Sequence, residues 1–166
     1  MEKINNKKSI TSIPKQLVSK KLLATLLDEF AFFGGIPFYV LVTLFAYFIG
    51  QKELYLALIY CFLLSFIIKL IITSLHYKER PRKQEFTIFM EKILASSFPS
   101  THSINSTILA ALLIITFQLR WIVITTLTFA ILVFIQRYVS KKHYFIDILG
   151  GILIAIAEII FVLRIV

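Results

Sequence analysis

Long runs of apolar residues, separated by short polar segments, fill most of the chain after residue 35. A spanning α-helix needs roughly 20 predominantly apolar residues to cross the hydrocarbon core of a bilayer. Five runs approach this length, at residues 36–50, 54–76, 103–119, 121–139 and 145–164. The pattern predicts an all-α integral membrane protein in which residues 1–166 form a single domain, a bundle of about five transmembrane helices.

The segment before the first run has a different pattern. Residues 1–14 are polar and are expected to form a tail. In residues 15–33 leucines recur at helical spacing, but five charged side chains interrupt them, too many for a span. We predict an amphipathic helix at the membrane interface. A cytosolic helix docked on the bundle fits the pattern equally well.

Composition agrees with a bilayer as the surrounding solvent. Hydrophobic residues make up 58% of the sequence and charged residues 16%, outside the usual range of soluble domains. The net charge of +9 is of the kind that nucleic-acid-binding proteins carry. The basic residues, however, lie at the ends of the apolar runs, where Lys and Arg set membrane topology. We therefore expect the lipid bilayer, and no nucleic acid, as the partner.

Five spans determine which connecting segments share a side of the membrane. The loops at 77–102 and 140–144 must emerge together with the amino-terminal segment, opposite Lys52 and Arg120. These two loops hold nearly all of the unusual polar residues, so chemistry is expected on their side.

The loop at 140–144 carries the first candidate group. His143 and Asp147 are four residues apart, so a helix that begins here would stack them on one face. A carboxylate in that position can hold one ring nitrogen as N–H and leave the other as a nucleophile or base. Arg137, at the end of the preceding span, offers a planar fork for phosphate oxygens. A basic interfacial loop in which Asp147 caps the last helix explains the same residues.

The second candidate group lies where the third span begins. Ser100 is well placed to cap this helix, and the unpaired N–H groups of a helix start can bind an anion. His102, in the first turn, could donate a proton to a leaving oxygen. An ordinary Pro-Ser cap with an interfacial histidine is the alternative.

Taken in order, three segments resemble the signature of the type 2 phosphatidic acid phosphatase superfamily, whose fold is shared with vanadium haloperoxidases. The matching segments are Arg80-Pro81, then Pro99-Ser100-Thr101-His102, then Arg137, His143 and Asp147 at the family's spacings, followed by Ile-Leu-Gly-Gly. The resemblance covers residues 69 to 151. It implies a membrane phosphatase of the all-α haloperoxidase-like fold.

The chain departs from the family pattern at three positions. Thr101 replaces a glycine, Gln136 replaces a serine, and Thr73 stands where the family has a lysine. Lys69 lies one helical turn before Thr73 and could extend toward the site, while Lys78 is a second candidate for the displaced lysine.

The resemblance also implies the roles of the site residues. His143 would attack phosphorus while Asp147 holds its ring, and His102 would protonate the leaving oxygen. Phosphate would be bound by Arg80, Arg137, Ser100, the backbone N–H of Thr101, and a lysine (Lys69 or Lys78). The resemblance implies neither a metal nor another cofactor.

The expected activity is phosphate removal from phosphatidate, phosphatidylglycerophosphate or a polyprenyl diphosphate. A non-enzymatic membrane scaffold or transporter subunit that retains the fold is the alternative. All lysines and arginines except Lys52, Arg120 and Arg164 fall on the side of the predicted site, so the positive-inside rule favours a cell-membrane protein with a cytoplasmic site. The sequence carries no signal for an oligomeric state.

Overall fold

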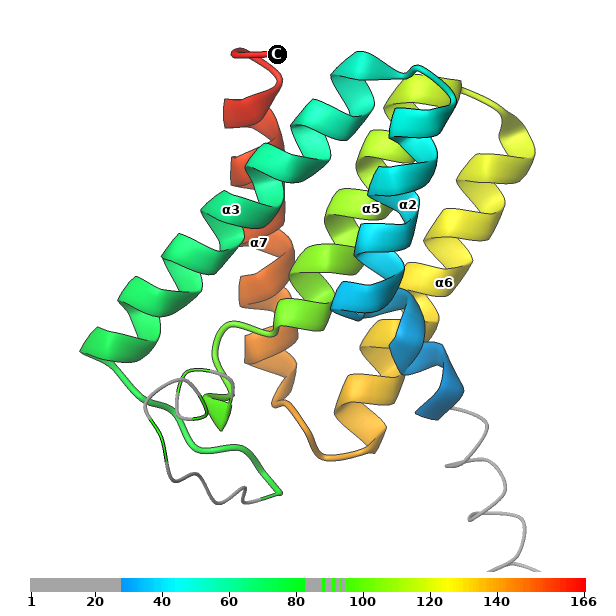
Figure 1. The fold of residues 1–166 in the computed structure, drawn as a ribbon. Helices are drawn as coiled ribbons and strands as arrows, with labels where there is room; N and C mark the ends of the chain where they lie inside the picture. Colours follow the sequence, from blue (N-terminus) through cyan, green and yellow to red (C-terminus); the bar gives the residue numbers. More distant parts are fainter. Residues whose placement is uncertain (1–27, 83–87, 89–90, 92, 94) are drawn as a thin grey trace, which may run out of the picture.

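The protein is an α-helical bundle. The computed structural model describes residues 28–82, 88, 91, 93 and 95–166, and these ranges contain helices and no strand. The elements that build the bundle are η1 (Ala31–Gly34, a short 3-10 helix), α2 (Ile36–Phe48), α3 (Lys52–Leu75), α5 (Thr101–Phe117), α6 (Arg120–Val139) and α7 (Phe145–Val162) (Figure 1). The all-α class predicted from the sequence is confirmed.

Within the described ranges, three helices are long and apolar enough to cross a membrane: α3, α6 and α7. The segments Asp28–Gly34 and Ile36–Phe48 act as a fourth candidate that is bent by 46°. The bend lies at Gly35, whose backbone is extended, and just before Pro37, which cannot donate a helical hydrogen bond. The apolar helix α5 has 17 residues and completes the five runs that the sequence showed.

The predicted amphipathic helix at 15–33 is described only in its last turns, because residues 1–27 lie outside the described ranges. Residues 28–34 are helical and pack on the bundle. Phe33 stacks on Phe129 of α6 with ring centroids 4.1 Å apart, and the backbone oxygen of Gly34 accepts a hydrogen bond from Asn105 of α5. This end of the segment therefore belongs to the helix bundle.

Helix α5 is the central helix and contacts α2, α3, α6, α7 and η1. Helices α6 and α7 both pack on it but contact each other little. The interior also holds polar groups: Ser65 donates a 2.6 Å hydrogen bond to the buried carboxylate of Glu158. Large apolar side chains such as Phe48 and Ile124 face outward. Apolar outside and polar inside is the distribution expected of a bundle surrounded by lipid.

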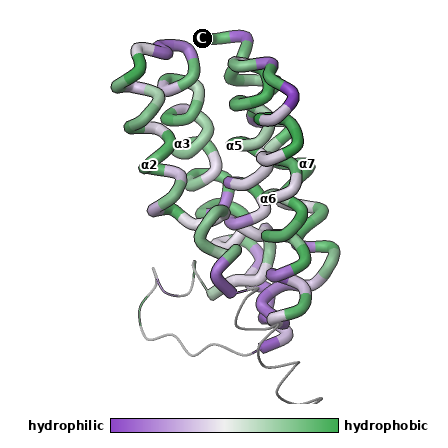
Figure 2. The backbone as a smooth tube through the Cα atoms, turned by 90° about the vertical axis from the view of Figure 1, so that its right-hand side faces the viewer, coloured by the Kyte–Doolittle hydropathy of each residue, from purple (hydrophilic) through white to green (hydrophobic). Residues whose placement is uncertain are grey.

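The two ends of the bundle differ in what they carry. The turns at residues 49–51 and 118–119 and the carboxyl terminus lie at one end, whereas residues 76–82 and 95–100, the loop at 140–144 and the start of the helical segment 28–34 lie at the other (Figure 1). Hydrophilic residues are concentrated toward these ends, and the helices between them are mostly hydrophobic (Figure 2). The described parts of the two loops predicted to share a side therefore lie at the same end of the bundle.

Candidate active site

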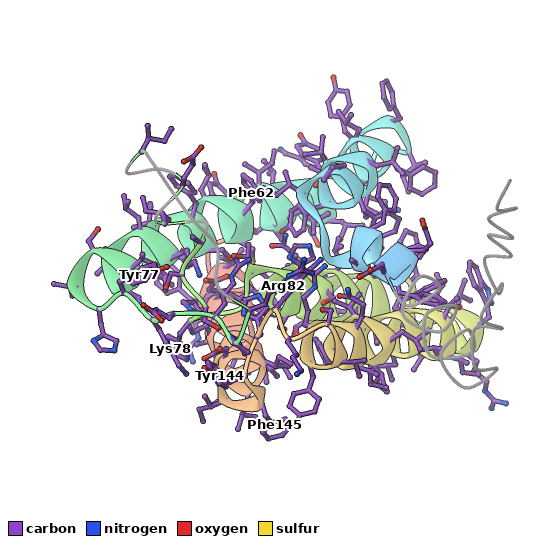
Figure 3. The ribbon with its side chains drawn as sticks, turned by 90° about the horizontal axis from the view of Figure 1, so that it is seen from below. Phe62, Tyr77, Lys78, Arg82, Tyr144 and Phe145 are labelled. Atoms are coloured by element: carbon purple, nitrogen blue, oxygen red, sulfur yellow. The ribbon has the colours of Figure 1, made fainter. Side chains whose placement is uncertain are left out.

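The two loops form direct backbone contacts. The N–H of Arg82 donates to the carbonyl of Lys141 at 2.9 Å, and the N–H of Ser100 donates to the carbonyl of Asp147 at 3.1 Å. Viewed from this end, Lys78 and Tyr144 lie side by side (Figure 3), with the Lys78 ammonium 5.0 Å from the centroid of the tyrosine ring. Segments that are far apart in the sequence thus build one polar cluster at the start of α5 and α7.

Ser100 caps α5 as the sequence predicts. Its hydroxyl accepts hydrogen bonds from the backbone N–H of Ser103 at 3.4 Å and from the Ser103 hydroxyl at 2.9 Å. A methyl group added at Gly151 would lie only 2.9 Å from the Ser100 carbonyl oxygen, and one at Gly150 would overlap the Phe98 ring. The glycine pair of α7 is therefore what lets this helix approach the capped end of α5.

His143 is almost fully buried in the cluster, with 3% of its surface exposed. Its Nδ1 atom lies 2.7 Å from the carbonyl oxygen of Ser97. A carbonyl can only accept, so Nδ1 carries the proton and Nε2 of the neutral ring has a free lone pair. Burial, followed by the Arg80 cation, lowers the pKa of His143 to about 3. The ring is thus neutral at physiological pH.

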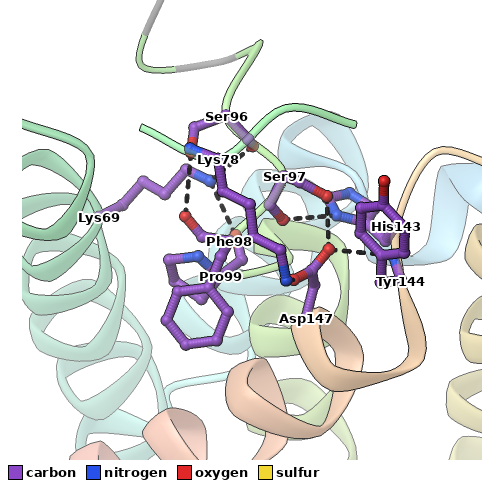
Figure 4. Close-up of polar contacts among 9 residues, drawn as sticks. All are labelled: Lys69, Lys78, Ser96, Ser97, Phe98, Pro99, His143, Tyr144 and Asp147. Carbon is purple, nitrogen blue, oxygen red and sulfur yellow. Dashed lines mark hydrogen bonds and ion pairs between the residues drawn. The ribbon is translucent and has the colours of Figure 1, made fainter. Parts of the chain in front are cut away.

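Asp147 was expected to hold the His143 ring, but its hydrogen-bond partners within the described ranges are other residues. Its carboxylate accepts hydrogen bonds from the hydroxyl of Ser97 and from the backbone N–H of Tyr144, and it forms a 2.6 Å ion pair with Lys78 (Figure 4). The two residues do not lie on one face of a helix, because α7 begins only at Phe145 and His143 precedes it. Asp147 instead caps α7 and holds the residue that contacts His143.

The two candidate lysines have different partners. Lys69 is buried, and its ammonium donates to the carbonyl oxygens of Ser96 at 3.0 Å and Pro99 at 2.8 Å. It is also one of the cations that act on His143. Lys78 is partly exposed and neutralises Asp147. Lys69 thus extends from α3 to the same loop and cluster, while Lys78 pairs with an acid.

Two arginines and the second histidine complete the cluster. Arg80 and Arg137 both interact electrostatically with His143 and with His102. Arg137 is buried, and its Nε has no hydrogen-bond partner within the described part of the chain. A buried guanidinium N–H without a partner is suited to an anion such as phosphate. Thr101 is the first residue of α5, where backbone N–H groups are available.

Two further residues, Ser97 and Gln136, belong to the cluster but were not among the predicted site residues. The backbone carbonyl of Ser97 contacts His143, and its hydroxyl donates a hydrogen bond to Asp147. A role of a backbone carbonyl cannot be recognised from a side-chain motif. Gln136 is fully buried and donates a 2.6 Å hydrogen bond to Asp28, which is 108 residues away in the sequence. Its departure from the family's serine was the only available signal.

A membrane-embedded helical bundle that gathers two imidazoles, two guanidinium groups and a capped helix start at one end has the parts of a phosphatase that acts at a membrane surface. The chain belongs to the PAP2 superfamily, whose family model matches residues 54–166. Membership supports a lipid phosphatase of the PAP2 type. The fold is similar to that in the crystal structure of Aquifex aeolicus LpxE, with a TM-score of 0.70, 22% sequence identity and 86% of each chain covered. No curated protein matches the chain significantly.

Proposed function

We propose that the protein hydrolyses a lipid phosphate or a polyprenyl diphosphate at the membrane surface, without a metal, through a phosphohistidine intermediate. The observation that carries the proposal is the state of His143. Its ring is neutral and buried, its Nδ1 is held by the Ser97 carbonyl, and cations from three segments surround it.

In the first step Nε2 of His143 attacks phosphorus, a P–N bond forms, and the P–O bond to the lipid breaks. Burial and neighbouring cations lower the pKa of His102 to about 3 in the substrate-free protein, so His102 takes up a proton together with the anionic substrate. It gives this proton to the departing oxygen, which leaves as the lipid alcohol or, from a diphosphate, as the lipid monophosphate. In the second step His102 accepts a proton from water, the resulting hydroxide attacks phosphorus, and the P–N bond breaks. Inorganic phosphate leaves and both imidazoles return to their initial state.

Charge stabilisation is the larger contribution to phosphoryl transfer. Arg80, Arg137 and Lys69 supply positive charge, and the Ser100 hydroxyl and the Thr101 N–H supply further donors. Lys78 acts indirectly in this proposal because its ammonium pairs with Asp147. Asp147 is a positioning residue that fixes Ser97 and thereby the tautomer of His143.

The test uses purified full-length protein in detergent with a chelator present. Phosphate release is measured from phosphatidate, phosphatidylglycerophosphate and a polyprenyl diphosphate. We expect wild type to act on at least one of these lipids, and His143→Ala to reduce the rate by about 10⁴-fold or more, as for loss of a catalytic nucleophile. The control is His76→Ala, an exposed histidine outside the cluster. A folded wild-type protein inactive on all three lipids would leave the scaffold alternative.

We also propose that the site faces the cytoplasm, since the basic residues lie on its side. Cys61 is buried, so introduced cysteines can be read separately with a membrane-impermeant thiol reagent. Lys52→Cys at the far end should react in intact cells, and His76→Cys only after permeabilisation. The reverse pattern would assign the site to the outer face.

A further inference from the structure

The helical segment 28–34, which includes η1, packs on α5 and α6, the helices that carry two of the candidate site residues. A methyl group added at Gly34 would lie only 2.9 Å from the carbonyl oxygen of His102. The backbone of the segment therefore lies directly against the start of α5. The family model matches residues 54–166, so this segment reaches the site from outside the part of the chain that defines the family match.

Asp28, the first residue of this segment, is hydrogen-bonded to the end of α6. The Nε2 atom of Gln136 donates to its Oδ1 atom at 2.6 Å. Gln136 is fully buried, whereas Asp28 is exposed, so the amide extends from the interior to a carboxylate at the surface of the bundle. Hydrogen bonds to an ionised group are stronger than those between neutral groups. This bond therefore fixes the last turn of α6 relative to the amino-terminal segment.

The last turn of α6 in turn holds the loop that carries His143. The carbonyl oxygen of Arg137 accepts hydrogen bonds from the backbone N–H groups of Lys142 and His143, each at 3.2 Å. The preceding carbonyl, that of Gln136, accepts from the hydroxyl of Ser140 at 2.6 Å and from its backbone N–H at 2.9 Å. A displacement of this turn would move both the Arg137 guanidinium and the His143 ring.

Asp28 also brings a negative charge to the cations of the site. Its carboxylate attracts the charged groups of Arg137 and Lys142, whereas Arg80 repels both. The carboxylate therefore offsets part of this repulsion when no phosphate is bound. The same charge opposes a phosphate anion that binds beside Arg137, because like charges repel each other at short range.

We propose that Asp28 is a positioning residue of the active site, which fixes Arg137 and the His143 loop through Gln136 and weakens the retention of phosphate. The hydrogen bond sets the geometry for turnover, and the charge sets the affinity for the anion. The first effect rests on the proposed function. The second can be measured by phosphate binding alone, without turnover.

Asp28→Asn separates the two effects, because an asparagine amide oxygen still accepts the hydrogen bond from Gln136 but carries no charge. Full-length protein in detergent is titrated with inorganic phosphate by calorimetry. We expect Asp28→Asn to bind phosphate about three- to tenfold more tightly than wild type at low salt, and the difference to shrink at high salt. The matched control is Glu29→Gln, which removes the charge of the neighbouring exposed acid and should stay within about twofold of wild type.

Single-turnover rates on a lipid phosphate test the hydrogen bond. Asp28→Ala removes the acceptor, and Gln136→Ser, which restores the family's residue, is too short to reach it. Each should lower the rate about tenfold, as for a lost charge-assisted hydrogen bond. The double variant should be no slower than the slower single variant, because both changes remove one contact. Asp28→Asn should stay within about threefold of wild type, and thermal unfolding checks that each variant is folded.

Unchanged or weaker phosphate binding by Asp28→Asn, or equal tightening by Glu29→Gln, would overturn the charge effect. A protein that is merely destabilised would bind phosphate less tightly, not more. Independent, multiplying losses in the double variant, or an Asp28→Ala rate within about twofold of wild type, would overturn the positioning role. A wild type that hydrolyses no lipid while the phosphate affinities keep the expected order would remove the phosphatase proposal and leave the charge effect of Asp28.

Discussion

The Nδ1 atom of His143 lies 2.7 Å from the carbonyl oxygen of Ser97, a residue of the loop before α5. This contact joins the two polar loops and fixes which ring nitrogen carries the proton. The same serine donates its hydroxyl to Asp147. The orientation of the His143 ring therefore depends on the Ser97 backbone, and only indirectly on the Asp147 carboxylate that holds Ser97.

The contacts from Asp147 to Ser97 and from Ser97 to His143 predict that Ser97→Ala lowers activity less than Asp147→Ala does. Ser97→Ala removes one hydrogen bond to Asp147 but keeps the carbonyl, so kcat should fall by about tenfold, as for a lost charge-assisted hydrogen bond. Asp147→Ala removes the cap of α7, the partner of Lys78 and the anchor of Ser97, and should lower both kcat and Tm more. Initial rates and thermal unfolding compare the two. A loss with Ser97→Ala as deep as with His143→Ala would contradict the positioning role.

His102 should matter in proportion to how poor the leaving group is. His102→Ala removes the proposed acid, so turnover of a lipid alkyl phosphate should fall by about 10²- to 10⁴-fold. An activated aryl phosphate, whose leaving oxygen needs no proton, should lose far less in the first step. Single-turnover rates on the two substrates measure the difference. Equal losses would assign His102 to binding instead of proton transfer.

Substitution should separate the roles of Lys69 and Lys78. Lys69→Ala leaves the buried carbonyl oxygens of Ser96 and Pro99 without their donor, which costs about 1–3 kcal/mol per group, and it removes a cation near His143. We expect lower Tm and a kcat/KM reduced more than in Lys78→Ala. Lys52→Ala, an exposed lysine at the far end, is the control. Near-normal kinetics for Lys69→Ala would transfer the phosphate-binding role to Lys78.

The pKa of His143 should rise when a neighbouring positive charge is removed. Burial and then the positive neighbours, Arg80 first among them, disfavour the imidazolium, so the pKa of about 3 keeps the ring neutral across the physiological range. Arg80→Gln removes the largest of these charges and should raise the pKa of His143. Titration by NMR with labelled histidine measures the shift in the substrate-free protein. Arg82→Gln, which removes a nearby exposed cation, should leave it unchanged.

The bundle, and the end of it that carries the polar cluster, were predictable because they depend on patterns within the sequence. Runs of about 20 apolar residues predict membrane-spanning helices, and the number of these helices determines which loops lie on the same side. Ser100 is of a residue type that commonly caps a helix start. Contacts between distant segments were not predictable. The spacing of His143 and Asp147 suits a helix, but the spacing cannot reveal that α7 starts two residues after the histidine.

Other features of the site had no local signal. Ser97 acts on His143 through its carbonyl, a group that every residue possesses. Lys69 and Lys78 were equally plausible until their partners, backbone carbonyls for one and a carboxylate for the other, distinguished them. The hydrogen bond between Gln136 and Asp28 required knowing how the amino-terminal helix packs.

The concentration of polar chemistry at a single end of the bundle has a consequence for the cell. Under the proposed function, only lipids of the adjacent monolayer can present a phosphate to His143, and molecules in the opposite monolayer must first cross the bilayer. The protein consequently samples one leaflet alone. The transbilayer movement of its substrate then limits how much of the total membrane pool it can consume.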